Sequence, residues 1–393
     1  MSYKAHFRRF LEADPERLHF AAHSHHLWPD VTFAAQQRCW LDAARLADRK
    51  WEHVFGTLIP SVQGGIARLL NLSRPEDIAF APNTHSLLNR LLSCLTPGRP
   101  LRVLTTDGEF HSLTRQLRRL EEDGLAQVDW LAVAPFDDFA ERFARAAARG
   151  GFDLVYLSQV FFNSGFAPAD AGALVAAVPD PETLVVLDGY HGFLALPTDL
   201  RAIEARAFYL AGGYKYAMAG EGAAFLHAPP GYGARPRDTG WYAAFGDLER
   251  GEGERGEGAR VGYGVDGSRF LGATFDPSGL YRLDAVLGWL AELGLDAAAI
   301  HAHAHRLQQN FVDGLSGLGL AALHPGQLVV PEPARRGNFL TFRTPAAGEI
   351  YDKLLARNVI TDTRANNLRF GFGLYHDDDD VERICEVLGE ILD

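Results

Sequence analysis

Two charged residues stand where buried strands are expected to end. The apolar run Leu184 to Leu187 predicts a buried parallel strand, and it leads directly into Asp188. Residues 206 to 210 predict the next strand, and two glycines then carry the chain to Lys215. Because the carboxyl ends of parallel strands meet at one edge of a sheet, we expect Asp188 and Lys215 to lie close together. An ionised Asp188 would need a cationic partner there, since an unpaired charge in an apolar interior is unfavourable.

An acid and a lysine in this arrangement suit the cofactor pyridoxal phosphate (PLP). The lysine amine forms an imine with the cofactor aldehyde, and the carboxylate keeps the pyridine nitrogen protonated so that the ring can withdraw electrons. Each residue alone also has an ordinary explanation, because Asp188 could cap a turn or a helix and Lys215 could be a surface lysine. The PLP interpretation therefore depends on their combination with further motifs.

The sequence resembles the class V aminotransferase superfamily of fold-type I PLP enzymes, and within it kynureninase most closely. The D-x-x-H formed by Asp188 and His191 and the Tyr214-Lys215 pair match motifs of that group. The resemblance implies that Asp188 and Lys215 are catalytic. It also implies that His191 and Tyr214 contact the cofactor, together with Asp188 and Lys215.

Strand and helix patterns alternate along the chain around these motifs. Residues 77–80, 101–106, 127–133 and 154–160 predict strands, with helical runs between them. Such alternation is typical of a parallel sheet covered on both faces, so we predict an α/β fold. The resemblance implies PLP-dependent transferase fold type I, in which helices sandwich a mostly parallel seven-stranded sheet and a smaller α+β domain follows.

The length of the chain predicts about two domains, because single cores stop growing near roughly 250 to 300 residues. We expect an N-terminal helical segment over residues 1–70 and a large PLP-binding domain over residues 71–280. A linker helix, from Leu280 to about Leu315, and a small α+β domain should fill residues 281–393. Residues 249–260 alternate Gly, Glu and Arg, which predicts a mobile loop that cannot bury apolar surface.

Further cofactor contacts follow from the resemblance. Thr84 and His85 open a predicted helix whose N–H groups suit a phosphate, although a plain helix cap has the same pattern. Phe110 falls on the position of the ring that lies flat on the pyridine. Trp241 and Thr274 match residues that reach the neighbouring subunit's site, with one extra residue before Thr274. The resemblance therefore implies a homodimer with active sites at the subunit interface.

Substrate contacts are implied in the same way. Arg369 matches the arginine that binds the α-carboxylate of an amino-acid substrate, a role that suits the forked guanidinium. Ser24 is the one residue that fits the segment bordering the substrate pocket of kynureninases, so we expect different pocket chemistry here. Gln159 and Asn163 follow a predicted strand at the place where the superfamily contacts the cofactor or the substrate.

Composition restricts the class of protein. The 393 residues include 50 acidic and 38 basic ones, for a net charge of -12, which argues against nucleic acid as the main partner. No apolar run is long enough to span a membrane, and the N-terminus leads into no secretory segment, so we expect a cytoplasmic protein without a membrane partner. His301 and His305 have the spacing of metal ligands but lack a third ligand, and we predict no metal site.

The reaction type stays open among three alternatives. In the superfamily an amino-acid substrate reacts through an external aldimine and a Cα carbanion. We favour a class V aminotransferase-type transferase, because the changed N-terminal pocket argues against a copied kynurenine site. A kynureninase-type hydrolase that cleaves Cβ–Cγ is the first alternative, and a non-catalytic PLP-binding protein is the other. A cysteine desulfurase would need a nucleophilic cysteine on a loop in the C-terminal part. The only cysteine after Lys215 is Cys385, in the predicted last helix, so we set that reaction aside.

Overall fold

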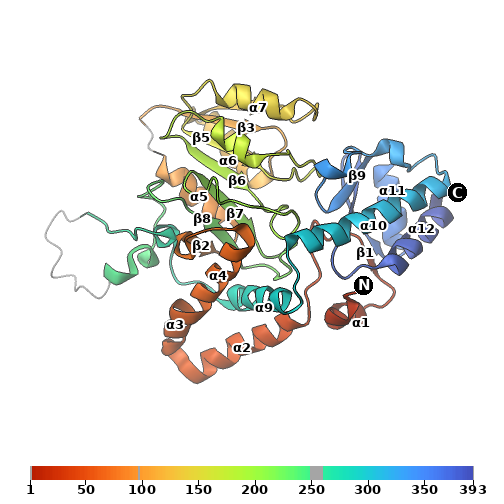
Figure 1. Ribbon diagram of the computed structural model, residues 1–393, viewed down its shortest axis with the longest axis horizontal. Helices are drawn as coiled ribbons and strands as arrows, with labels where there is room; N and C mark the ends of the chain where they lie inside the picture. The colour runs from red at the N-terminus through yellow and green to blue at the C-terminus, as the bar shows by residue number, and fades with distance from the viewer. Residues whose placement is uncertain (1, 96–97, 248–259, 393) are drawn as a thin grey trace.

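A mostly parallel sheet forms the centre of the larger part of the molecule (Figure 1). The computed structural model describes residues 2–95, 98–247 and 260–392, so residues 249–259 of the predicted loop lie outside the described residues. Within the described residues the sheet has seven strands, in the order β2 (Ile78–Ala81), β8 (Ala224–His227), β7 (Ala207–Gly212), β6 (Leu184–Asp188), β5 (Leu154–Ser158), β3 (Leu101–Thr106) and β4 (Ala126–Leu131). The five strands from β7 to β4 are parallel, and β8 pairs antiparallel with both β7 and β2.

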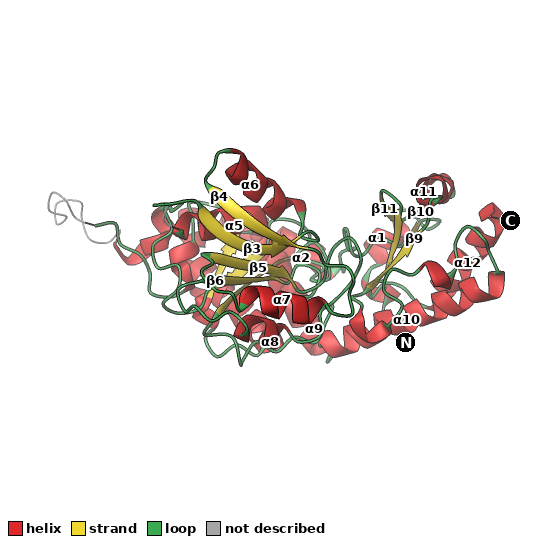
Figure 2. Cartoon of the chain, turned by 90° about the horizontal axis from the view of Figure 1, so that it is seen from above, coloured by secondary structure: helices red, strands yellow, loops and turns green. Residues whose placement is uncertain are grey.

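Helices cover both faces of this sheet, because neighbouring strand residues point to opposite sides. Figure 2 shows the sheet between the two layers. On one face α5 (Thr84–Cys94) and α6 (His111–Glu122) pack on side chains such as Val186. On the other face the core joins Val185 and Leu187 to α4 (Ile59–Leu70), α7 (Phe139–Ala147), α8 (Ala171–Ala176) and α9 (Ser278–Glu292). The predicted α/β fold with a sandwiched sheet is confirmed.

The C-terminal part has its own sheet and its own core. Strands β11 (Asp362–Arg364), β12 (Asn367–Gly371) and β9 (Phe339–Arg343) form an antiparallel sheet. Apolar residues of this sheet pack against α10 (Ala297–Leu318), α11 (Ala347–Ala356) and α12 (Asp378–Leu392). In Figure 1, α10 extends from the large sheet into this part. Arg369 lies on β12, and its side chain is buried.

The predicted linker helix is two helices. Helix α9 ends at Glu292 and α10 begins at Ala297. Gly294 between them has a φ of 66°, a left-handed conformation that favours glycine. The Asp296 side chain then accepts a hydrogen bond from the Ala299 N–H, which caps the second helix. The prediction of one continuous helix was wrong, because apolar periodicity continues across a short break that these caps impose.

The N-terminal segment packs on both parts of the molecule. It contains α1 (Arg8–Glu12), α2 (Val31–Leu46), α3 (Lys50–His53), the π-helical turn η3 (Val54–Leu58) and α4. Strand β1 (Leu18–His19) pairs in parallel with β10 (Val359–Ile360), whereas α2 packs beside α9. The division at residues 70 and 280 stays a prediction. None of the helices in the described residues has the length and apolar character needed to cross a membrane.

Candidate active site

Lys215 enters the site from a tight turn after β7. A Cβ on Gly212 would lie 2.4 Å from the hydroxyl oxygen of Tyr190, and one on Gly213 would lie 2.8 Å from the carbonyl oxygen of Gly220. Both separations are too short for a side chain, so the turn requires glycine at these two positions. The sequence thus builds a turn in which the chain can place Lys215 next to the ring of Tyr190.

The Lys215 amine is buried, and its surroundings favour the neutral form. Its Nζ atom donates a hydrogen bond to the carbonyl oxygen of His23 at 3.0 Å. Burial, and after it the positive charge of Arg369, lower the Lys215 pKa to about 7 against the opposing attraction of Asp188 and Asp362. A substantial fraction of this lysine is therefore an uncharged amine at neutral pH.

Asp188 ends β6 beside Ser158 of β5, as the strand pattern predicts. Its carboxylate accepts a hydrogen bond from the Tyr156 hydroxyl at 2.8 Å and one from the Tyr190 N–H at 2.9 Å. Among the described residues no cation forms an ion pair with it, and Lys215 acts only through longer-range attraction. The expected cationic partner is thus replaced by two neutral donors. Burial raises the Asp188 pKa, and these two hydrogen bonds and Lys215 oppose the rise.

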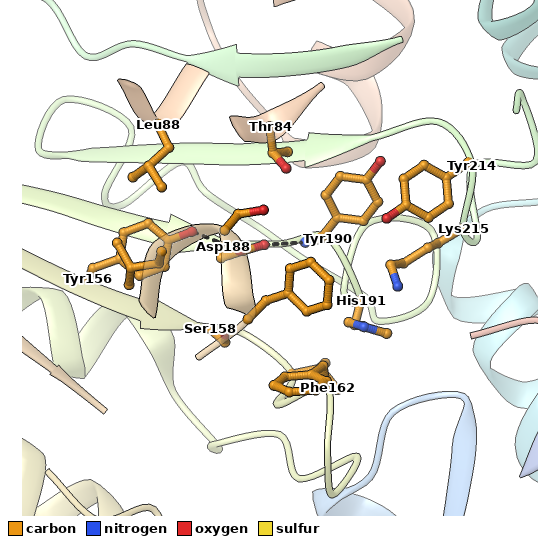
Figure 3. Close-up of a pocket in the computed structure, with 14 residues that line it drawn as sticks. Thr84, Leu88, Tyr156, Ser158, Phe162, Asp188, Tyr190, His191, Tyr214 and Lys215 are labelled. Atoms are coloured by element: carbon orange, nitrogen blue, oxygen red, sulfur yellow. Dashed lines mark hydrogen bonds between the residues drawn. The ribbon is translucent and has the colours of Figure 1, made fainter. Parts of the chain in front are cut away.

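The two groups share one pocket of about 510 Å³, counting the part open to solvent. Six residues implied by the resemblance line it together, namely Thr84, Phe110, Asp188, His191, Tyr214 and Lys215. They come from the carboxyl ends of strands and the start of helices. Figure 3 shows the rings of Tyr190 and Tyr214 side by side, with the Lys215 amine near His191. The ring centroids of the two tyrosines are 4.9 Å apart.

Two features of the pocket suit a ligand. Thr84 begins α5, whose free N–H groups attract an anion, and the Asn83 side chain caps this end by accepting from the Ser86 N–H at 2.9 Å. His191 is buried, and its Nδ1 atom has no hydrogen-bond partner among the described residues. Burial lowers its pKa well below the usual range, and Lys215 and Arg369 lower it further. His191 thus offers a neutral ring to the pocket.

Arg369 lies beside the pocket in a buried position on β12. Its guanidinium donates to the carbonyl oxygen of Phe162, whose ring lines the pocket, and forms an ion pair with Asp362. The Nε atom has no partner within the described part of the chain. Next to it the buried His23 ring stacks on Phe339, with centroids 4.7 Å apart. The guanidinium is also near enough to Lys215 for its charge to lower the pKa of that lysine.

Several predicted residues lie outside the pocket lining. His85 is exposed, and its ring contacts the Asn89 amide at 3.2 Å, because it follows Thr84 by one helical position and points away. Gln159 bonds to Thr198 and to Tyr209. The structure does not bring these two polar side chains to Lys215.

The remaining candidates lie nearer the surface. Asn163 is exposed and accepts a hydrogen bond from Asn367 at 3.0 Å, and the half-buried Ser24 contacts the ring of its neighbour His25 at 3.3 Å. Trp241 is exposed in η5 (Trp241–Asp247), and Thr274 is exposed as well. Both are close to Tyr242, as the Trp241 ring stacks on it and the Thr274 side chain hydrogen-bonds to it. Their role at a second subunit stays a prediction.

One buried acid was not found by sequence reasoning. The Glu109 carboxyl group accepts a hydrogen bond from the Thr106 hydroxyl at 2.7 Å, and its other oxygen lies 2.5 Å from the Ser158 hydroxyl oxygen. Burial, with a contribution from the negative charge of Asp188, raises the Glu109 pKa to about 8 although its hydrogen bonds to Ser158 and Thr106 oppose the rise. Its position directly before Phe110 was the available signal, but a single acid in a loop indicates no partner. Tyr156 and Tyr190 were also missed, because a single tyrosine in a buried strand or a turn indicates no partner.

Comparison with known proteins concerns the C-terminal part and the fold. Residues 300–388, which include Arg369, match the family model described as "Kynureninase C-terminal domain". A sequence search of curated proteins found no match. The cystine C-S lyase C-DES, in complex with its reaction product cysteine persulfide, is similar in structure with a TM-score of 0.76 at 18% identity, over 95% of this chain and 97% of that one.

Two further solved structures are similar over nearly their whole length. A C-DES variant with glycine covalently linked to its PLP cofactor has a TM-score of 0.79 at 18% identity, over 98% of this chain and 99% of that one. The cysteine desulfurase CsdA from Escherichia coli has a TM-score of 0.76 at 15% identity, over 99% and 97% of the two chains. The chain thus has the fold of class V, fold-type I enzymes, and the predicted fold and superfamily resemblance are confirmed.

Proposed function

We propose that this protein is a PLP-dependent enzyme that acts on an α-amino acid. The observation that carries the proposal is one pocket that Asp188 and Lys215 both line, from the ends of neighbouring strands. The chain has four lysines, and Lys215 alone lines this pocket. The other three, Lys4, Lys50 and Lys353, are half-buried or exposed elsewhere.

The residues of the pocket fit PLP in several respects. The start of α5 at Thr84 offers N–H groups for a phosphate, and Phe110 and Tyr214 offer aromatic walls for a flat ring. Asp188 suits a protonated pyridine nitrogen, the cation that this buried acid lacks in the described chain. The unpartnered Nδ1 of His191 can bind a polar substituent of the ring.

The residues of the pocket and Arg369 suggest which group would carry out each part of the reaction. When bound, PLP supplies an aldehyde that exchanges amines and a ring that withdraws electrons from the Cα atom of the substrate. Lys215, with its pKa near 7, accepts and returns a proton at Cα. Arg369 exchanges the carbonyl of Phe162 or Asp362 for the substrate carboxylate, which also fixes the Cα–H bond in relation to Lys215.

We propose an aminotransferase-type reaction as the first candidate. Transamination moves one proton between two carbon atoms, and Lys215 alone suffices for that transfer. The kynureninase-type hydrolysis of Cβ–Cγ is the second candidate, and the match of residues 300–388 to the kynureninase C-terminal domain favours it. The cysteine desulfurase reaction lacks its nucleophile, because Cys385 lies on α12 against α10 and burial raises its thiol pKa to about 11.

Product analysis separates the two candidates. PLP-loaded protein is incubated with L-kynurenine and, separately, with common amino acids and a 2-oxo acid. Formation of a new amino acid from the 2-oxo acid supports the aminotransferase, whereas anthranilate and alanine from kynurenine support the hydrolase. A Lys215→Ala variant serves as the control for non-enzymatic reaction with free PLP. Turnover by wild type that equals this control in every assay would contradict the proposal.

We also propose that the working unit is a homodimer. Large apolar side chains are exposed on α2, where Phe33 and Trp40 lie on one helical stripe with Leu41, and Trp241 is exposed on η5. Isolated exposed apolar residues are ordinary, but a stripe along one helix favours a protein interface. The amino-acid substrate would then reach a site that two chains border.

A further inference from the structure

The buried acid Glu109 contacts Ser158, a residue that lines the pocket. Glu109 is 2% exposed and lies directly before Phe110. Its Oε2 atom lies 2.5 Å from the Ser158 hydroxyl oxygen, and its Oε1 atom accepts from the Thr106 hydroxyl at 2.7 Å and the Ser158 N–H at 3.2 Å. Ser158 itself lines the pocket, so Glu109 contacts the cofactor site through this hydroxyl.

The surroundings of Glu109 disfavour a negative charge. Among the described residues it has no ion pair with a cation, and its hydrogen-bond partners are neutral groups of β3 and β5. The charged group that faces it is Asp188 of β6, and the other titratable neighbour is Tyr156 of β5. Two carboxylates this near to each other in an apolar interior do not both ionise readily. Both carboxyl groups have hydrogen-bond partners that oppose the effect of burial, but Asp188 also has the attraction of Lys215, so Glu109 is the group that keeps a proton.

We propose that Glu109 is a positioning residue that, in its protonated form, donates a hydrogen bond to Ser158 and so turns the Ser158 hydroxyl into a donor toward the cofactor site. A hydroxyl has one hydrogen and two lone pairs. If Glu109 were ionised, the hydrogen of Ser158 would be used in the contact with the carboxylate, and only lone pairs would face the pocket. A protonated Glu109 reverses this direction and leaves the hydrogen of Ser158 free.

This inference rests on the proposed function, and it predicts how cofactor affinity depends on pH. Wild-type protein should bind PLP about two- to tenfold more weakly once Glu109 ionises, the value of one hydrogen bond. The loss should follow the Glu109 pKa of about 8. Glu109→Gln should remove this pH step, because its amide N–H donates to Ser158 at every pH, and should keep the affinity that wild type has at low pH.

The experiment compares PLP affinity, measured by absorbance titration, for wild type, Glu109→Gln, Glu109→Ala and Ser158→Ala at about pH 6.5 and about pH 9. Circular dichroism melting curves check that each variant is folded. Ser158→Ala should bind PLP weakly at both pH values, and adding Glu109→Gln to it should change nothing more. A pH step of equal size in wild type and Glu109→Gln, or a Gln variant as weak as Glu109→Ala, would overturn the role of Glu109.

Infrared spectroscopy provides a readout that does not depend on cofactor. At about pH 6.5 the difference between wild type and Glu109→Gln should contain the carbonyl band of a protonated carboxyl group, and Ser158→Ala should shift that band. Absence of the band would overturn the inference even if PLP binds. If the band is present but wild type does not bind PLP, the result would contradict the proposed function and would still support a protonated Glu109.

Discussion

At the scale of single residues, Lys215 combines burial with a nearby cation. Burial and Arg369 bring its pKa from an ordinary value of 10.5 to about 7. At pH values between these two pKa values, the Lys215 amine holds a proton in the unfolded chain but has released it in the folded protein. The free energy of unfolding should therefore rise with pH across this window, because stability rises wherever the unfolded state binds more protons.

This linkage predicts the effect of Lys215→Met on the cofactor-free protein. Methionine fills the site without an amine, so the variant should be more stable than wild type by about 2 to 4 kcal/mol near pH 7, and the difference should vanish above about pH 10.5. Urea denaturation at several pH values measures both free energies. A difference that is constant over this range would show that Lys215 is not held as a neutral buried amine.

A second prediction concerns Arg369. Lysine keeps the charge but cannot form the forked contact with a carboxylate, so Arg369→Lys should weaken amino-acid binding about ten- to hundredfold while PLP still binds. Titration of the cofactor absorbance with amino acid measures the affinity. Arg364→Lys is the matched control, because Arg364 also pairs with Asp362 but is exposed. Equal losses in the two variants would argue against a carboxylate role for Arg369.

How far the site could be predicted depends on the kind of signal. Asp188 and Lys215 stand in motifs with fixed spacing at strand ends, so they could be read from the sequence. Glu109, by contrast, acts through a contact with Ser158 across 49 positions of the chain. Such a contact follows from the order of strands in the sheet, and no local pattern records it. The direction of the His85 side chain likewise depends on the orientation of α5.

At the scale of elements, the turn between β7 and Lys215 sets the geometry of the site. A Cβ on Gly213 would meet the carbonyl oxygen of Gly220 at 2.8 Å, so Gly213→Ala should cost about 1 to 3 kcal/mol of stability and weaken PLP binding. Gly288→Ala in α9 is the control, since nothing lies within 4 Å of its Cβ position. It should be neutral or stabilising by up to about 1 kcal/mol.

Thermal melting and PLP titration of the two variants test this claim. If Gly213→Ala melts and binds PLP like Gly288→Ala, the turn does not restrict the position of Lys215. The strands around this turn were predicted within a few residues, because buried parallel strands leave continuous apolar runs. The antiparallel direction of β8 and the pairing of β1 with β10 were not predicted, as two-residue strands and strand direction leave no periodic signal.

At the scale of the whole molecule, the proposed homodimer makes a direct prediction. The chain has a mass of 43.1 kDa, and light scattering of the purified protein should give twice this value. Trp40→Glu places a charge on the exposed apolar stripe of α2 and should shift the mass toward that of one chain. The exposed Leu355 on α11 gives a control, since Leu355→Glu should leave the mass unchanged. A single-chain mass for wild type would contradict the dimer.

The proposed activity requires that Lys215 holds PLP, and chemical trapping of the bound cofactor tests this. Wild-type protein is loaded with PLP, freed of excess cofactor, reduced with borohydride and digested for peptide mass mapping. We expect a cofactor-derived mass on the peptide with Lys215, and none on those with Lys4, Lys50 or Lys353. Lys215→Ala protein should carry no such mass. An adduct on another lysine, or wild type without any adduct, would show that Lys215 does not hold PLP.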